Sequence, residues 1–270
     1  MNLAGKVALV TGAARGIGRG IARALAAEGV LLAAADAPGA KDPTISYQLA
    51  APADLQETIR LITDQGGRAI PLTGDVTRVT DVDAMVRETV RALGGLDILV
   101  NNAGILISGP VEALTEDQWD RQMAVNVKGC FLCARAAAPE LKERGGGAIV
   151  NISSIAGKVG YAFLAGYCAS KFAVIGLTQA LAQELAPANI RVNAVCPGLV
   201  RTPLYVEGSG SFHAERLGLS AEEVFDHYRQ QVPLGREQTP EDIGEAVVYL
   251  CRAENVTGVA LTVAGGRVMF

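Results

Sequence analysis

The sequence contains few aromatic residues, few histidines and no long hydrophobic run. Aromatic side chains make up 5% of the 270 residues, and the two histidines are His213 and His227. No apolar stretch reaches the roughly 18 residues that a membrane-spanning helix needs. The first residues do not show a basic segment followed by a long apolar one, so we expect no secretory signal. These absences predict a cytoplasmic protein without a membrane partner.

Cysteine is also scarce, and the cysteine count is odd. Five cysteines in a chain of 270 residues do not indicate a disulfide framework. Cys130 and Cys133 form a C-x-x-C pair, but the pair lies inside a helical pattern, where two small buried residues one turn apart are the plainer interpretation. Because there are two histidines and no second cysteine pair at zinc spacing, we expect no metal site.

Charge of one sign is not concentrated anywhere. Lys and Arg total 24, Asp and Glu total 28, and the net charge is −4. An acidic chain without basic blocks excludes nucleic acid and anionic membranes as expected partners. Hydrophobic residues make up 50% and charged residues 19%, a balance that excludes intrinsic disorder and supplies a sizeable core. The 31 glycines suit close packing of helices on a sheet.

Short apolar runs alternate along the chain with longer segments of helical periodicity. This alternation predicts crossover connections and a parallel sheet that is covered on both faces. No linker divides the chain, so we predict a single α/β domain over residues 1–270. The expected strands are 7–10, 30–35, 69–72, 97–100, 148–152, 191–195 and 260–263. The expected helices are 17–28, 54–65, 81–93, 117–143, 166–185 and 242–252.

Two segments interrupt this alternation. Residues 37–53 contain Pro38, Pro43 and Pro52, so we expect no regular helix there. Residues 201–219 are rich in glycine and serine with scattered apolar residues, and we expect them to be mobile. With the residues that follow, up to 235, they are candidates for a lid over a substrate.

A glycine-rich turn joins the first expected strand to the first expected helix. It reads Thr11-Gly12-Ala13-Ala14-Arg15-Gly16-Ile17-Gly18. Gly12 allows a tight turn, Gly16 allows the backbone to approach a pyrophosphate, and Gly18 lets the helix pack closely. The free N–H groups and the partial positive charge of the helix N-terminus would bind the phosphates. The sequence therefore predicts a dinucleotide site at this turn.

Asp36 ends the second expected strand, 18 residues after Gly18. A carboxylate at this place can accept hydrogen bonds from both ribose hydroxyls of adenosine, and it repels a 2′-phosphate. Arg15 favours the opposite choice because it can meet a 2′-phosphate. We rank Asp36 higher, since a desolvated like-charge contact costs several kcal/mol, whereas Arg15 can turn into solvent. NAD is therefore the expected cofactor, with NADP as the less favoured one.

The segment Tyr167-Cys168-Ala169-Ser170-Lys171 carries the most specific chemical signal. Tyr167 and Lys171 lie one helical turn apart on the same face. To exchange a proton with an alcohol near pH 7, the tyrosine pKa must fall by roughly three units from its ordinary value near 10. A neighbouring ammonium favours the phenolate, so we expect Lys171 to lower the pKa of Tyr167. Ser154 precedes Tyr167 by 13 residues and can hold the substrate oxygen.

With these motifs together, the sequence resembles the short-chain dehydrogenase/reductase family, of its shorter type. The resemblance covers the chain from Gly5 to about Gly266 and implies a Rossmann-like sheet of about seven strands in the order 3-2-1-4-5-6-7. The matching motifs, in family order, are Thr11 to Gly18, Asp75-Val76, Asn101-Asn102-Ala103-Gly104, Asn126-Val127, Ser154, Tyr167 with Lys171, and Pro197-Gly198.

The resemblance assigns roles to these positions. It implies that Asp75 and Val76 hold the adenine ring, and that Asn126 anchors a water in a proton relay through Lys171 and the nicotinamide ribose. The catalytic residues would be Asn126, Ser154, Tyr167 and Lys171. The cofactor-binding residues would be Gly12, Arg15, Gly16, Ile17, Gly18, Asp36, Asp75, Val76, Asn102, Ala103, Gly104, Tyr167, Lys171, Pro197, Gly198, Val200 and Thr202.

Two departures from the family pattern stand out. The last expected strand ends Val263-Ala264-Gly265-Gly266, where relatives often have Val-Asp-Gly-Gly, and we expect this change to affect packing near a subunit contact. The proline-rich stretch after Asp36 is longer than usual. It resembles the insertion of a carveol-dehydrogenase-like subgroup whose members hold NAD tightly; a plain surface loop is the alternative.

These inferences combine into one main hypothesis and two rivals. The main hypothesis is reversible hydride transfer between NAD and a secondary alcohol or ketone, nonpolar or cyclic, which Ser154, Tyr161, Tyr167 and Leu204 contact. The rivals are an NADPH-dependent 3-ketoacyl reductase and a non-catalytic, NAD-binding regulatory or scaffold protein. The resemblance also implies a homo-oligomer, a tetramer or else a dimer, built partly on residues 117–143 and 166–185. The expected pocket-lining residues are Ile105, Leu106, Ile107, Ile155, Tyr161, Phe163, Leu204, Tyr205, Phe212 and Phe225.

Overall fold

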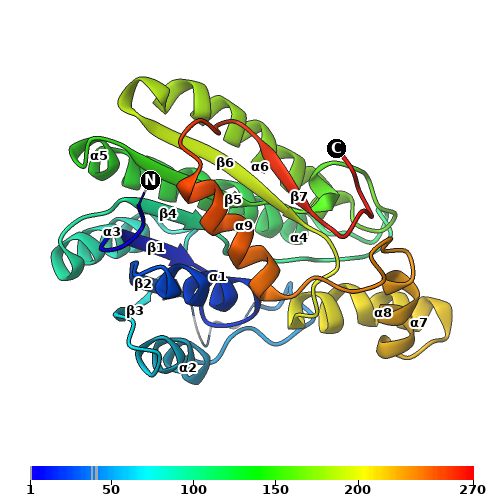
Figure 1. Ribbon diagram of the computed structural model, residues 1–270. Helices are drawn as coiled ribbons and strands as arrows, with labels where there is room; N and C mark the ends of the chain where they lie inside the picture. The colour runs from blue at the N-terminus through cyan, green and yellow to red at the C-terminus, as the bar shows by residue number, and fades with distance from the viewer. Residues whose placement is uncertain (1, 38, 40–41) are drawn as a thin grey trace.

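The computed structural model describes residues 2–37, 39 and 42–270. Pro38, one of the prolines expected to keep residues 37–53 irregular, lies outside this part of the chain. Within the described residues, seven strands form one sheet in the order β3-β2-β1-β4-β5-β6-β7, and every neighbouring pair is parallel (Figure 1). The strands are β1 (Val7–Thr11), β2 (Leu31–Asp36), β3 (Ala69–Thr73), β4 (Ile98–Asn101), β5 (Gly147–Ile152), β6 (Ile190–Pro197) and β7 (Ala260–Val263).

The helices connect these strands and cover both faces of the sheet. The α-helices are α1 (Gly16–Ala27), α2 (Pro52–Thr63), α3 (Val79–Leu93), α4 (Glu116–Met123), α5 (Gly129–Glu143), α6 (Ala165–Leu185), α7 (Ser211–Leu217), α8 (Ala221–Arg229) and α9 (Pro240–Arg252). Four short elements complete the fold, namely the π-helices η1 (Ala124–Lys128) and η4 (Leu204–Gly210) and the 3₁₀-helices η2 (Ile155–Gly157) and η3 (Ala186–Ala188). The predicted doubly wound α/β fold and its strand order are confirmed.

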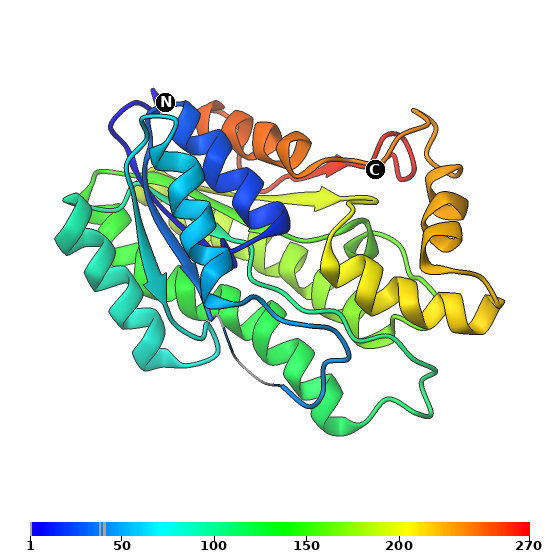
Figure 2. The same ribbon diagram turned by 90° about the horizontal axis from the view of Figure 1, so that it is seen from below.

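The central strands are apolar on both sides because both sides are buried. Val10 and Val100 pack in the core beneath α1 and α9, whereas Leu9 and Leu99 pack in the opposite core beneath α3 and α5. Side chains of successive strand residues point to opposite faces, so one continuous apolar run feeds two cores. Figure 2 shows α1 and α9 on one side of the sheet and α3 and α5 on the other.

The predicted single helix over residues 117–143 is wrong in one respect. It divides into α4 and α5, and the π-helix η1 between them adds a residue to the turn. Asn126 lies in this wider turn and is hydrogen-bonded to Ile105 in the loop that follows β4. Gly129 follows at once, and a Cβ on Gly129 would lie 2.8 Å from Val76 Cγ2. Side-chain periodicity does not reveal a single extra residue in a long helix.

Two further expectations about irregular segments need correction. Pro52 and Ala53 belong to α2, because Pro52 is the first helical residue, a position that needs no backbone N–H. Residues 201–219 are largely helical, since η4 and α7 fill them, and α8 follows. Ser220 begins α8 with a capping box, in which its hydroxyl accepts from Glu223 N at 3.2 Å. Glycine content alone did not indicate these helices.

Candidate active site

The carboxyl ends of the strands border a cavity of about 650 Å³. Thr11, Asp36, Ile152 and Pro197, the last residues of β1, β2, β5 and β6, all line it. The cavity therefore lies where parallel sheets bind their ligands, at the point where the strand order reverses. Its volume is typical of a pocket for a small molecule or cofactor.

The glycine turn after β1 is shaped by close contacts with the loop after β4. A Cβ on Gly12 would lie 2.8 Å from Ala103 Cα, and a Cβ on Gly18 would collide with the carbonyl oxygen of Gly12. Asn102 fixes this arrangement, because its Nδ2 donates to Thr11 O at 3.0 Å and to Gly12 O at 2.9 Å. The predicted need for glycine at both positions has a direct steric cause.

The N-terminus of α1 faces the cavity with its backbone donors available. No side chain caps the helix, and its first turn contains no acidic residue. Arg15, Gly16 and Ile17 all line the cavity. A helix N-terminus with free N–H groups and a partial positive charge suits a pyrophosphate, so the residues present fit a dinucleotide at this place.

Asp36 and Arg15 meet the cavity in different ways. The Asp36 carboxylate accepts from Ala14 N at 2.9 Å and from Ala37 N at 2.8 Å, and it lines the cavity. Burial raises the pKa of Asp36, and the two backbone donors oppose that rise. The Arg15 guanidinium donates to the carbonyl oxygen of Gln48, in the segment after β2. Arg15 is thus held by residues 37–53, the segment after Asp36 that we call the insertion.

The segments after β3 and β4 contribute unequally. Val76 and the run from Asn102 to Gly104 line the cavity, as predicted for cofactor contacts. Asp75 is not among the lining residues. Its carboxylate accepts instead from Thr77 N and from Thr77 Oγ1, each at 2.8 Å, and lies 3.7 Å from Arg121 Nη2. The structure thus gives Asp75 a role in holding its own turn.

The segment after β6, for which the resemblance implies contact with the cofactor, forms part of the cavity wall. Pro197, Gly198, Val200 and Thr202 all line the cavity. A Cβ on Gly198 would lie 2.8 Å from Ala264 Cα. Ala264 is the position at which the sequence departs from the family pattern. Ala264 therefore packs directly behind Gly198, a residue of the cavity wall in the same chain.

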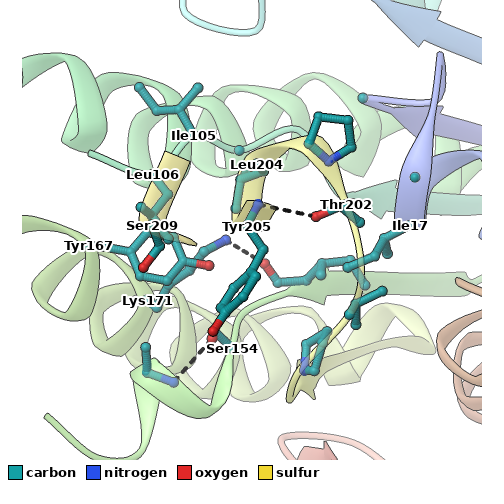
Figure 3. A pocket seen from close by; sticks show the side chains of 18 of the residues that line it. Ile17, Ile105, Leu106, Ser154, Tyr167, Lys171, Thr202, Leu204, Tyr205 and Ser209 are labelled. Carbon is teal, nitrogen blue, oxygen red and sulfur yellow. Dashed lines mark hydrogen bonds between the residues drawn. The ribbon is translucent and has the colours of Figure 1, made fainter. Parts of the chain in front are cut away.

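Ser154, Tyr167 and Lys171 meet in the same cavity (Figure 3). Tyr167 and Lys171 project from one face of α6, with Lys171 Nζ 5.6 Å from the Tyr167 ring centroid. Lys171 Nζ donates to Ile152 O at 2.9 Å, which fixes the ammonium against the end of β5. Ser154 precedes η2, and its hydroxyl accepts from Ala156 N at 3.1 Å. The spacing of the sequence motif thus brings the three side chains together.

The expected acidity of Tyr167 is wrong for the chain by itself. Burial raises the pKa of Tyr167 well above its ordinary range, and a hydrogen bond with Ser154 opposes the rise. Burial likewise lowers the pKa of Lys171. A dry pocket disfavours both the phenolate and the ammonium. One lysine at this distance does not outweigh that cost, so a low tyrosine pKa would need further positive charge.

Asn126 stands behind the cavity wall and is fully buried. Its Oδ1 accepts from Ile105 N at 2.8 Å, and its Nδ2 donates to Ile105 O at 2.9 Å and to Ser170 Oγ at 3.0 Å. The side chain therefore joins the loop after β4 to α6. A Cβ on Gly104 would lie 3.3 Å from Asn126 Oδ1 and 3.4 Å from Lys171 Nζ, so both polar groups approach the cavity behind this glycine.

The structure places most of the predicted substrate contacts in the cavity wall and excludes three. Tyr161 and Leu204 are present as predicted. Ile107, Phe212 and Phe225 do not line the cavity, and Phe225 lies beneath Tyr205 with ring centroids 5.6 Å apart. The predicted residues that do line it are Ile105, Leu106, Ile155, Tyr161, Phe163, Leu204 and Tyr205.

Several lining residues were not predicted from the sequence. Tyr47 reaches the cavity from the insertion, where its hydroxyl accepts from Leu106 N at 3.2 Å. A Cβ on Gly208 would lie 3.1 Å from the Tyr47 ring. The sequence offered one signal for this contact, because Tyr47 is an isolated tyrosine in a segment poor in aromatic residues. Toward the C-terminus, the unpredicted lining residues include His213, Arg216, His227, Tyr228 and Arg267.

The described residues offer neither a metal cluster nor a membrane-spanning helix. No group of three or more His, Cys, Asp or Glu side chains is arranged to hold a metal ion in residues 2–37, 39 and 42–270. Over the same residues, none of the helices combines the length and the apolar character that crossing a membrane requires. All five cysteines are buried as free thiols.

Comparison with known proteins gives the family. A model of the short chain dehydrogenases matches residues 6–209. The 3-alpha-(or 20-beta)-hydroxysteroid dehydrogenase of Mycobacterium bovis is 40% identical over 269 residues, which cover 99% of this chain and 91% of that protein. The carveol dehydrogenase of Mycobacterium avium, solved with NAD, superposes with a TM-score of 0.92 at 34% identity, covering 98% of both chains.

An actinorhodin polyketide ketoreductase solved with NADPH is also similar. It superposes with a TM-score of 0.90 at 38% identity and covers 98% of each chain. The relatives thus include users of either nicotinamide cofactor, on one shared fold. Together with the glycine turn and the Ser154, Tyr167 and Lys171 cluster, these matches show that the chain belongs to the short-chain dehydrogenase/reductase family, as an oxidoreductase that acts on alcohols or ketones.

Proposed function

We propose that the protein is an NAD-dependent dehydrogenase and reductase of secondary alcohols and ketones. The choice of NAD rests on the different positions of Asp36 and Arg15. Asp36 presents a carboxylate to the cavity, held by Ala14 N and Ala37 N. Arg15 is bound to the carbonyl oxygen of Gln48. A 2′-phosphate would meet a fixed negative charge while the nearest arginine is already engaged.

The same two contacts disfavour the NADPH-dependent ketoacyl reductase. That alternative rests on Arg15, and it would require the guanidinium to leave Gln48. The segment after Asp36 engages a second arginine of the cavity. Arg121 lines the cavity, and its Nε donates to Asp42 Oδ2 at 2.6 Å, so this guanidinium is already paired with a carboxylate.

The bound nicotinamide supplies the hydride chemistry, and the residues of the chain handle the proton. In reduction, the Tyr167 hydroxyl donates a proton to the carbonyl oxygen, while the Ser154 hydroxyl donates a hydrogen bond to the same oxygen. In oxidation, Tyr167 accepts the alcohol proton. Lys171 is anchored at Ile152 O and favours the phenolate when Tyr167 loses its proton. Asn126 keeps Ile105 and α6 in register behind this group.

The walls favour a nonpolar or cyclic substrate body. Leu106, Ile155 and Leu204 give the cavity apolar surface next to Tyr167. The similar proteins named for carveol and for hydroxysteroids support the same class. Residues 201–235, which contain η4, α7 and α8, border this end of the cavity, and we propose that they act as the lid.

We also propose a homo-oligomer, most simply a tetramer. Trp119, Phe131 and Phe172 lie on α4, α5 and α6 with 39%, 45% and 47% of their surface exposed. Large apolar side chains exposed on neighbouring helices mark contact surfaces between protein chains. Sedimentation velocity separates monomer, dimer and tetramer, and a monomer at micromolar concentration would contradict this assignment.

One experiment tests the function. Purified protein is given secondary alcohols and ketones with NAD, NADP and their reduced forms, and absorbance of the reduced nicotinamide is followed. We expect kcat/KM to favour NAD by at least about tenfold, which corresponds to roughly 1.4 kcal/mol. Tyr167→Phe should bind NAD normally and lose about 100- to 10,000-fold in turnover. Unchanged turnover would end the assignment of Tyr167, and NAD binding without turnover of any alcohol would favour the regulatory or scaffold protein.

A further inference from the structure

The part of the cavity beyond Tyr167 carries cationic side chains and no carboxylate. We call this part the distal pocket and define it by the lining residues Tyr161, Phe163, Tyr205, Tyr228, Arg216 and Arg267. Among the described residues that line the whole cavity, the one acidic side chain is Asp36. Asp36 is bound to Ala14 at the glycine turn, so it does not neutralise the distal pocket.

A tightly packed glycine turn positions Arg267 in the distal pocket. Gly265 and Gly266 have φ values of +58° and +91°, in the left-handed region that glycine adopts without strain. A Cβ on Gly265 would lie 2.5 Å from Val232 Cγ1, and a Cβ on Gly266 would lie 3.0 Å from Pro233 Cγ. The double-glycine turn is therefore pressed against the segment after α8, and it fixes where Arg267 leaves the chain.

The Arg267 guanidinium lies against two aromatic rings, and one of its N–H groups donates a hydrogen bond to a side chain. Its Cζ is 5.0 Å from the Tyr228 ring centroid and 5.7 Å from the Tyr161 ring centroid. Its Nη2 donates to Gln231 Oε1 at 3.3 Å. No carboxylate of the described residues lies within ion-pair distance of it. A guanidinium has five N–H donors in a fork that matches a carboxylate.

Arg201 shows what a purely structural arginine looks like here. Its Cζ stacks 3.8 Å from the Phe225 ring centroid, a closer ring contact than that of Arg267. Arg201 is also paired with Glu222 at 2.7 Å and with Glu237 at 3.6 Å, so two carboxylates balance its charge. Arg201 is therefore neutralised by carboxylates, whereas the charge of Arg267 has no carboxylate partner among the described residues.

The charge of Arg267 also acts across the pocket. Burial raises the pKa of both Tyr161 and Tyr205, and Arg267 opposes that rise at each of them. Arg216 adds a second cation at the rim, with its Cζ 4.2 Å from the Phe163 ring centroid. An unpaired cation in a partly apolar pocket attracts anions more strongly than it would in water. A cationic substrate would be repelled from the same place.

We propose that the substrate is a secondary alcohol or ketone that carries a carboxylate, and that Arg267 receives this carboxylate in the distal pocket. The proposal rests on the proposed function and adds a substrate class to it. The apolar walls hold the carbon body between the two polar ends, with the reacting oxygen at Ser154 and Tyr167. Arg267 is thus a specificity-determining residue.

Matched pairs of compounds test this substrate class. Each pair has a carboxylate and its neutral carboxamide: 4-(1-hydroxyethyl)benzoate, 4-hydroxycyclohexanecarboxylate and 5-hydroxyhexanoate with their amides. With NAD, we expect the preferred carboxylate to exceed its amide at least tenfold in kcat/KM, and the advantage to shrink as salt is added. Arg267→Gln should remove the advantage and leave the rate with the amide within about twofold. Arg201→Gln is the control and should leave the preference intact.

A binding measurement separates this proposal from the proposed function. Titration of 4-acetylbenzoate and 4-acetylbenzamide into the protein saturated with NAD measures binding without turnover, because the oxidised cofactor cannot reduce a ketone. Tighter binding of the benzoate, lost in Arg267→Gln and partly kept in Arg267→Lys, supports the carboxylate site even if no alcohol is oxidised, and that result would overturn the proposed function alone. Equal binding of both ketones, or equal losses for both in Arg267→Gln, would overturn the carboxylate site and leave the dehydrogenase standing.

Discussion

The cofactor side and the substrate side of the cavity are built in different ways. On the cofactor side, backbone meets backbone: a Cβ on Gly12 would lie 2.8 Å from Ala103 Cα. On the substrate side, side chains meet side chains: Tyr205 packs edge-on against Phe225 and Tyr228, with centroids 5.6 and 6.4 Å apart. A backbone-built site tolerates one residue type at key positions, whereas a side-chain-built site can be refilled. This difference explains how one fold serves many substrates with one kind of cofactor.

Outside the group of Ser154, Tyr167 and Lys171, the largest effect should come from one methyl group on the cofactor side. In Gly18→Ala, the new Cβ collides with the Gly12 carbonyl oxygen, and backbone cannot move aside as a side chain can. We expect the free energy of unfolding to fall by about 2–3 kcal/mol and the Kd for NAD to rise about 100-fold. Denaturant titration and calorimetry measure the two quantities.

Gly109→Ala is the matched control for this substitution. A Cβ on Gly109 meets nothing within 4 Å, so stability should change by no more than about 0.5 kcal/mol and NAD binding should stay the same. If Gly18→Ala behaved like this control, the claim that backbone packing builds the cofactor side would be wrong.

The same contrast decides what could be predicted from sequence. The fold was predictable because the strands are buried on both faces and their apolar runs leave a strong signal. Gly12 and Gly18 were predictable because a tight strand-to-helix turn requires glycine, and Asp36 because a carboxylate at the end of the second strand suits the ribose of adenosine. Tyr167 and Lys171 were predictable because a helix places residues four apart on one face. Each of these rules is local in the chain.

The missed features depend on contacts between distant segments. Tyr47 and Arg267 reach the cavity from opposite ends of the sequence, and no local pattern marks either of them. The extra residue in η1 changes no side-chain periodicity that a short window detects. The pKa of Tyr167 failed as a prediction because burial, which depends on the whole fold, outweighs the effect of one neighbouring ammonium.

A pH series tests whether burial controls Tyr167. Burial raises the pKa of Tyr167, so the protonated form dominates at neutral pH. Alcohol oxidation needs the phenolate, and its single-turnover rate should therefore rise about tenfold per pH unit below the apparent pKa. Ketone reduction uses the protonated form and should stay flat until high pH, where it falls. An oxidation rate that does not change between pH 6 and 9 would contradict this account.

A smaller change, in the preference for NAD over NADP, should follow from removing the acidic residue at the end of β2. Asp36→Ala removes both the ribose acceptor and the charge that repels a 2′-phosphate. We expect kcat/KM with NAD to fall and kcat/KM with NADP to rise, so that their ratio changes by about tenfold to 100-fold. Arg15→Met is the comparison, and it should leave the preference for NAD in place. If Arg15→Met reversed the preference instead, Arg15 would be the residue that selects the cofactor.

The smallest effect should appear where the two sides meet. Tyr47 belongs to the insertion of the cofactor side, but its ring packs against Gly208 of η4, and its hydroxyl accepts from Leu106 N at 3.2 Å. In Tyr47→Phe the ring contact remains and Leu106 N loses its partner, which costs about 1 kcal/mol. We expect a lower midpoint of denaturation and a KM raised severalfold, with kcat nearly unchanged.

The size of this last effect also bears on the chemistry. Burial raises the pKa of Tyr47 to about 12, so its hydroxyl keeps its proton at neutral pH. A neutral Tyr47 at working pH can align the wall but cannot serve as a base. If Tyr47→Phe instead lowered kcat by orders of magnitude, the hydroxyl would be part of the proton path, and the boundary between the two sides would run through the catalytic group itself.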